Sequence, residues 1–167
     1  VRGEKLVALA CSTGGPKALH QVIPKLPKNM DAPMVIVQHM PKGFTNSLAI
    51  RLNEMSQVTV KEAADGDVLQ KGWVYIAPGG KQMRVLKVGG TYKIAVTDEP
   101  ARDALRPCAN IMYESLVCSN FDEITSRDDC ISGVMYQTAF GGGTVRPEFE
   151  ILTGLTTDYL PSGSVPW

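Results

Sequence analysis

The feature that most constrains this chain is a regular alternation of continuous apolar segments with amphipathic ones. The apolar segments 5–11 and 32–38 are followed by the segments 16–26 and 44–56, whose apolar residues recur at helical spacing. Continuous apolar runs are typical of strands buried on both faces, because a strand with one face in water alternates apolar and polar residues. The order strand, helix, strand, helix predicts a parallel sheet with helices packed on it.

Proline positions and helical spacing define the two helical segments further. Pro16 stands in the first turn of the first one, where its missing N–H costs nothing. Pro24 falls inside the same segment, so we expect the helix to stop or kink there. In the second segment the spacing predicts one buried face, formed by Phe44, Leu48, Leu52 and Met55.

The next part of the chain continues the pattern and adds a hairpin. Segments 58–63 and 72–80 are strand candidates, 82–99 is predicted to form a β-hairpin that turns at Gly89-Gly90, and 107–117 is a third helix candidate. We therefore expect an α/β fold with a doubly wound, mostly parallel sheet, helices on both faces and a β-hairpin.

Length and charge narrow the class of protein. A chain of 167 residues can bury one sizeable core, and we expect residues 1–167 to form one domain. Lys+Arg and Asp+Glu balance at 17 each, so no basic excess points to nucleic acid. No apolar segment is long enough for a membrane span and no signal peptide is evident, so we predict a cytoplasmic protein without membrane insertion. Val1 is not an initiator methionine, which suggests a fragment of a longer protein.

The cysteines and histidines are few and scattered. The four cysteines form no CxxC pair, and we interpret them as reduced, mostly buried thiols rather than a zinc site or a disulfide frame. His20 lies on the first helix without an acid or serine arranged around it, so we interpret it as structural or exposed. No metal and no cofactor is predicted.

Two polar residues end the first two predicted strands. Ser12 follows the apolar segment 5–11, and His39 follows 32–38. In an open parallel α/β sheet, ligands bind beyond the carboxyl ends of the strands, so neighbouring strands would place both side chains at one edge. Imidazole is suited to take the proton of a serine at neutral pH, and such a pair would be the nucleophile and base of an acyl-transfer reaction.

The glycines after Ser12 are consistent with an oxyanion hole for acyl transfer, and also with a phosphate-binding turn. Gly14 and Gly15 leave backbone N–H groups uncovered at a helix start, as an oxyanion hole requires. A glycine-rich strand-to-helix turn can equally bind phosphate. However, "CSTGGPK" is not GxGxxG, a P-loop or the GxSxG elbow. His39 taken alone could also be a hydrogen-bonded structural histidine.

Several segments together resemble the catalytic domain of the CheB family of chemotaxis receptor methylesterases. The matching segments are "ACSTGGPKAL", "VIVQHMPKGFTNSLAIRLN", "VKEAADGDVLQKGWVYIAPGGKQM" and "LRPCANIMYESL". They keep the family's order and spacing over residues 6–116. The STGGP turn, the QHMP strand end and the GxVYIAPGG segment are highly specific in combination, whereas each alone would be weak.

The resemblance implies a cytoplasmic serine hydrolase that removes methyl groups from glutamate methyl esters of methyl-accepting chemotaxis receptors and in many members also deamidates glutamines. Ser12 would be the nucleophile and His39 its base. Thr13 and the neighbouring groups of Gly14, Gly15 and Met40 would complete the oxyanion and substrate site. The family normally carries a receiver domain ahead of this one, so we expect one in the full-length protein.

The resemblance weakens after residue 123. The family's next strand ends in a TGMGxDG loop that supplies the catalytic aspartate, whereas here segment 151–154, ILTG, is followed by Asp158. We predict that Asp158 orients His39, because it follows a plausible strand. Asp128 and Asp129 precede an apolar stretch and would emerge at the opposite edge. Gln82 stands where the family has a histidine. The alternative hypothesis is therefore a degenerate, non-hydrolytic module that still binds receptors.

Overall fold

The computed structural model describes residues 6–121, with the side chains of the last helix as far as Leu116. Four parallel strands form one sheet in the order β1-β2-β4-β3. A separate antiparallel pair, β5 and β6, forms the hairpin. The strands are β1 (Val7–Cys11), β2 (Met34–Gln38), β3 (Thr59–Glu62), β4 (Trp73–Ile76), β5 (Gln82–Val88) and β6 (Thr91–Thr97). The helices are α1 (Gly15–Val22), the short 3₁₀ helix η1 (Ile23–Lys25), α2 (Phe44–Met55) and α3 (Ala109–Phe121).

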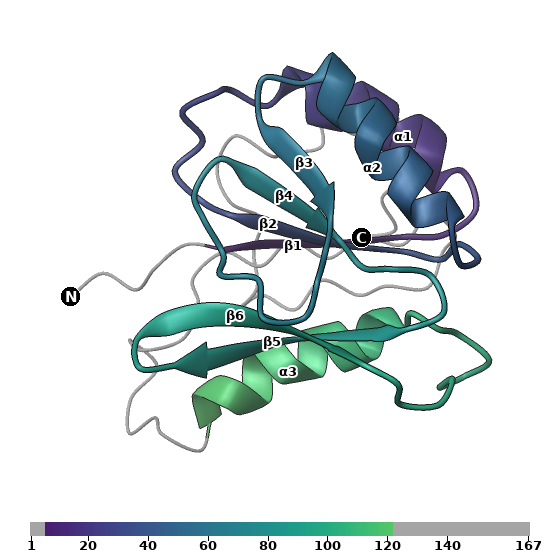
Figure 1. Ribbon diagram of the computed structural model, residues 1–167, viewed down its shortest axis with the longest axis vertical. Coiled ribbons are helices and arrows are strands. Elements are labelled where there is room, and N and C mark those ends of the chain that lie inside the picture. Colours follow the sequence, from purple (N-terminus) through teal and green to yellow (C-terminus); the bar gives the residue numbers. More distant parts are fainter. Residues whose placement is uncertain (1–5, 122–167) are drawn as a thin grey trace, which may run out of the picture.

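Different elements cover the two faces of the parallel sheet. Figure 1 shows α1 and α2 on one side of it and the β5–β6 hairpin with α3 on the other. Successive residues of a strand point to opposite faces, so Leu9 joins the core under α1 and α2 while Ala8 and Ala10 join the core under the hairpin and α3. β1 is apolar throughout and β2 is apolar up to Gln38, because both faces of these two strands are buried, whereas the edge strand β3 carries Lys61 and Glu62. The predicted α/β architecture is confirmed.

The breaks between elements follow the proline and glycine positions. Helix α1 has a proline in its first turn and ends at Val22, and Pro24 lies within η1, as predicted. The hairpin turns at Gly89 and Gly90, whose φ angles of 59° and 80° require residues without a Cβ. Val88 and Thr91 pair across this turn.

The predicted buried face of α2 is wrong at both ends. Phe44 is 60% exposed and Met55 is 45% exposed. The buried residues of α2 are Thr45, Leu48, Ala49 and Leu52. Thr45 belongs to the buried stripe although it is polar, because its hydroxyl has partners inside the protein. Phe44 lies about 100° around the helix from it. Apolarity alone could not distinguish this stripe from the predicted one.

The observed buried face predicts that two alanine substitutions in α2 lower the free energy of unfolding by different amounts. Leu52 is fully buried, so Leu52→Ala should lower the free energy of unfolding by about 2–5 kcal/mol. Met55→Ala, at the exposed end of the same helix, should change it by less than about 0.5 kcal/mol. Urea unfolding followed by circular dichroism measures both. Equal losses in the two variants would contradict the assigned face.

Candidate active site

Parallel pairing of β1 with β2 brings Ser12 and His39 together at one edge of the sheet. Cys11 pairs with Gln38, and the His39 N–H donates to the Cys11 carbonyl at 3.1 Å. Ser12 and His39 each follow directly on this last pair, at the ends of two neighbouring strands. Neighbouring strands lie about 4.8 Å apart in a sheet. The predicted proximity of these two strand ends is confirmed. Both residues are half-buried.

The turn after Ser12 presents backbone donors that have no partner among the described residues. Thr13 and Gly14 are exposed, and Gly14 has a φ of 81°, which favours glycine. The Gly15 N–H donates to the Ser12 carbonyl at 2.8 Å. The N–H groups of Thr13 and Gly14 donate to no group within residues 6–116. They lie where α1 begins, and the positive end of a helix dipole favours a negative charge there.

Gln38 lies beneath this turn, and sequence reasoning missed it. Its side chain is buried, and Nε2 donates to the Ser12 carbonyl at 3.0 Å. A Cβ on Gly15 would come within 1.9 Å of Gln38 Oε1 and 2.6 Å of Cys11 Cβ, so only glycine fits there. The available signal was a polar residue at the last position of an otherwise apolar strand.

Burial determines the charge of the His39 ring. Burial lowers the pKa of His39 below its ordinary value of 6.5, so the imidazole is uncharged at neutral pH. Its Nε2 atom is buried and has no hydrogen-bond partner within the part of the chain that the structure describes. Met40, the next residue, is half-buried and packs against the core under α1 and α2.

A hydrogen-bonded chain from three elements holds the loop after β4 against the segment that follows His39. A Cβ on Gly79 would lie 2.4 Å from the Pro41 carbonyl oxygen, so these two loops are in close contact. The Gly79 N–H donates to Thr45 Oγ1 at 2.9 Å, and the Thr45 hydroxyl donates to Glu62 Oε2 at 2.6 Å. Sequence reasoning did not single out Thr45 or Glu62.

Two other singled-out residues have roles away from the serine turn. Gln82 is fully buried and donates to the carbonyls of Pro100 and Leu105 at 3.1 Å each. Its Oε1 accepts the Cys108 N–H at 2.7 Å, so this side chain anchors the segment before α3. His20 Nδ1 lies 2.6 Å from the Pro16 carbonyl oxygen one turn earlier in α1, which fits the structural interpretation.

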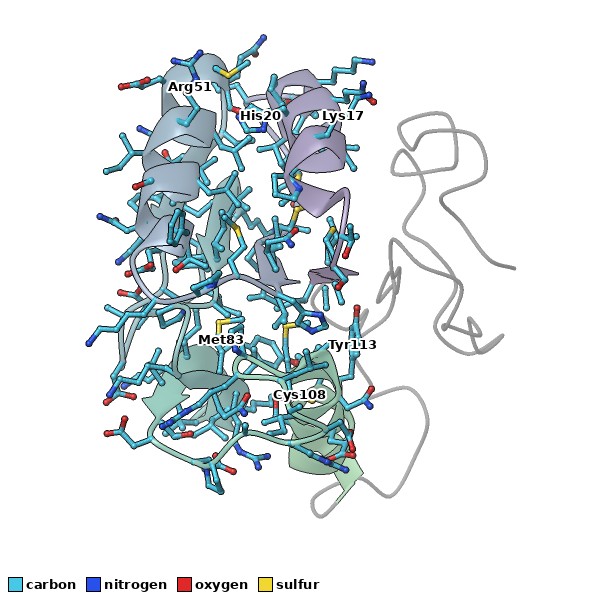
Figure 2. The ribbon with its side chains drawn as sticks, turned by 90° about the vertical axis from the view of Figure 1, so that its right-hand side faces the viewer. Lys17, His20, Arg51, Met83, Cys108 and Tyr113 are labelled. Carbon is cyan, nitrogen blue, oxygen red and sulfur yellow. The ribbon has the colours of Figure 1, made fainter. Side chains whose placement is uncertain are left out.

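The labelled side chains separate into the two layers that flank the sheet. In Figure 2, Lys17, His20 and Arg51 lie in the layer of α1 and α2, whereas Met83, Cys108 and Tyr113 lie in the layer of the hairpin and α3. Cys11 and Cys108 are free and buried, and burial raises the pKa of the Cys11 thiol to about 12, which makes that thiol inert.

The predicted aspartates lie outside the described residues. Asp158 and its rivals Asp128 and Asp129 all follow the last described position, 121. Within residues 6–116, no group of three or more His, Cys, Asp or Glu side chains could hold a metal ion. No helix among the described residues is long and apolar enough to cross a membrane.

The described part of the chain is an α/β domain whose parallel sheet is covered on both faces and places Ser12 and His39 at adjoining strand ends. The model of the CheB methylesterase family matches residues 7–124. The chain belongs to this family.

Named relatives and a solved structure agree with that assignment. The protein-glutamate methylesterase/protein-glutamine glutaminase of Bacillus licheniformis is 45% identical over 170 residues, which covers 96% of this chain and 48% of the relative. The Bacillus subtilis protein of the same name is 47% identical over 114 residues, 68% of this chain and 32% of the relative. The chain thus spans at most about half the length of these relatives. The crystal structure of the Thermotoga maritima CheB methylesterase catalytic domain is 36% identical with a TM-score of 0.71, covering 86% of this chain and 70% of that one.

The burial of His39 predicts where its ring titrates. In a His20→Asn variant, the remaining imidazole resonance should titrate with a midpoint below 6.5 in an NMR pH series. The folded chain then binds this proton more weakly than the unfolded chain. The contribution of His39 to stability is therefore complete above pH 6.5 and is lost as the pH falls toward the folded pKa. A midpoint above 6.5 would contradict the burial-driven shift.

Proposed function

We propose that this chain is the catalytic part of a protein-glutamate methylesterase in which Ser12 is the nucleophile and His39 the general base. The observation that carries the proposal is the register of β1 and β2, which sets both residues side by side at the carboxyl edge. The N–H groups of Thr13 and Gly14, which have no partner within residues 6–116, support it, because an acyl-transfer site needs donors for a developing oxyanion.

The proposed reaction has two half-reactions. His39 takes the proton of the Ser12 hydroxyl as the oxygen attacks the ester carbonyl, and the tetrahedral oxyanion accepts hydrogen bonds from the turn. The imidazolium returns the proton to the methoxy group, which leaves as methanol, and an acyl-serine remains. Water activated by His39 then attacks the acyl group, which releases the glutamate carboxylate and restores the Ser12 hydroxyl.

The substrates and partners are proposed from the family. The names of the Bacillus relatives include both methylesterase and glutaminase activity. We propose that glutamate methyl esters on chemoreceptors are the substrates. Glutamine side chains are a second proposed substrate, whose deamidation releases ammonia. We propose that the protein acts in the cytoplasm, on the cytoplasmic parts of the receptors, and that a receiver domain in the full-length protein regulates it.

The hydrolytic function is better supported than a non-hydrolytic receptor-binding module. The Bacillus licheniformis relative aligns over 96% of this chain at 45% identity, so the likeness extends well past residue 123. Strand β1 pairs with β2 up to Cys11 and Gln38, and the loop of Gly79 contacts the segment that follows His39.

Replacing the nucleophile should abolish hydrolysis. Ser12→Ala should lower turnover of a methyl-esterified receptor by about a million-fold, because nucleophile and base act as a unit. Methanol release measures the activity. Ser12 is half-buried at a turn, so the free energy of unfolding should change by less than about 0.5 kcal/mol. A folded variant that kept a tenth of wild-type turnover would exclude Ser12 as the nucleophile.

We further propose that Asp158 orients His39 and stabilises the imidazolium. Asp158→Asn should then lower turnover by about 10⁴-fold, because the amide favours the wrong imidazole tautomer. The matched controls are Asp128→Asn and Asp129→Asn, which should keep turnover within a few-fold of the wild type. If one of the controls loses activity and Asp158→Asn does not, the orienting carboxylate is assigned to the wrong residue.

A further inference from the structure

The buried amide of Gln38 bonds to the backbone of both proposed catalytic residues. Its side chain is 1% exposed, and Nε2 lies 3.0 Å from the Ser12 carbonyl oxygen and 3.5 Å from the His39 carbonyl oxygen. The first contact is a normal hydrogen bond and the second is long. One side-chain amide therefore joins the ends of β1 and β2 beyond their last paired position, Cys11 with Gln38.

The first of these bonds helps to fix the direction of the Thr13 N–H. The Ser12 carbonyl accepts hydrogen bonds from Gln38 Nε2 and from the Gly15 N–H, so it is fixed toward the protein interior. A trans peptide unit is planar, and its C=O and N–H point in opposite directions. A carbonyl of Ser12 held inward consequently turns the Thr13 N–H outward, where it has no partner among the described residues. The longer contact, from Gln38 Nε2 to the His39 carbonyl oxygen, orients the Met40 N–H in the same way, because the His39 carbonyl and the Met40 N–H belong to one peptide unit.

Stability alone does not favour an amide at this position. Gln38 Oε1 is buried and has no hydrogen-bond partner within the described part of the chain. It also excludes any side chain at Gly15, since a Cβ there would come within 1.9 Å of it. A buried acceptor left unpaired destabilises the folded state, whereas a methionine would fill similar space without that penalty. The amide is thus better explained by what its N–H group positions.

We propose that Gln38 is a positioning residue that aims the Thr13 N–H, and more weakly the Met40 N–H, at the oxygen that becomes negative during attack by Ser12. The inference rests on the proposed function. In this arrangement the donors are already oriented before substrate binds, so they need no reorganisation when charge develops. Gln38 itself touches no substrate and exchanges no proton.

Replacing Gln38 should slow the chemical step without weakening substrate binding. Gln38→Met keeps a side chain of similar length and removes the N–H donor. Because hydrogen bonds to an oxyanion strengthen only in the transition state, kcat should fall by about a hundred-fold while KM changes by less than about two-fold. The pH dependence of kcat/KM should keep the position of its acid limb, because His39 is untouched.

A thionoester substrate distinguishes donor positioning from a general loss of structure. Sulfur accepts hydrogen bonds poorly, so an intact oxyanion site should hydrolyse a glutamyl peptide O-methyl ester faster than its O-methyl thionoester. Gln38→Met should reduce the wild-type ester-to-thionoester rate ratio by about ten-fold or more. Gln38→Leu, which also lacks the donor, should reduce the ratio in the same direction.

Gln82→Met is the matched control, because Gln82 is an equally buried amide with three hydrogen bonds on the other face of the sheet. It should lower the unfolding midpoint but leave the rate ratio at the wild-type value, measured where the variant is folded. An unchanged ratio in folded Gln38 variants would overturn the inference. Full activity of Ser12→Ala would instead overturn the proposed function, so the two failures are distinguishable.

Discussion

The parallel pairing of β1 with β2 is the constraint on which the rest of the site depends. The two strands pair from Val7 with Met34 to Cys11 with Gln38, and the bond from the His39 N–H to the Cys11 carbonyl continues the ladder by one residue. A slip of one residue would turn every side chain of one strand to the opposite face. Both faces are buried against different layers, so the core enforces the register that sets Ser12 beside His39.

Polar side chains at the carboxyl edge of the sheet hold the loops that follow these strands in place. Gln38 holds the start of α1, and the chain from Gly79 through Thr45 to Glu62 holds the loop after β4. The packing around these loops is close: a Cβ on Gly15 would clash with the side chains of Gln38 and Cys11, and a Cβ on Gly79 would clash with the Pro41 carbonyl. Buried polar networks of this kind specify one arrangement of loops, since any other leaves their donors unpaired.

Much of the fold was predictable because apolar periodicity and breaker residues act locally. Continuous apolar runs marked β1 and β2, Pro24 marked the end of α1, and Gly89-Gly90 marked the hairpin turn. The buried face of α2 was predicted wrongly, because the burial of Thr45 depends on partners 17 and 34 positions away in the chain. Ser12 and His39 could be singled out because strand ends converge at one edge of a parallel sheet. Gln38 could not, since its bond to Ser12 spans 26 positions and exists only once the strands pair.

Covalent labelling tests most directly whether this register creates an activated serine. A fluorophosphonate reacts with a serine hydroxyl only when a base and an oxyanion site assist it. Peptide mass spectrometry of the labelled wild-type chain should find one adduct, on Ser12, and labelling should slow as the pH falls through the lowered pKa of His39. A folded protein that stays unlabelled, or that is labelled at another serine, would contradict the assignment of this edge as the active site.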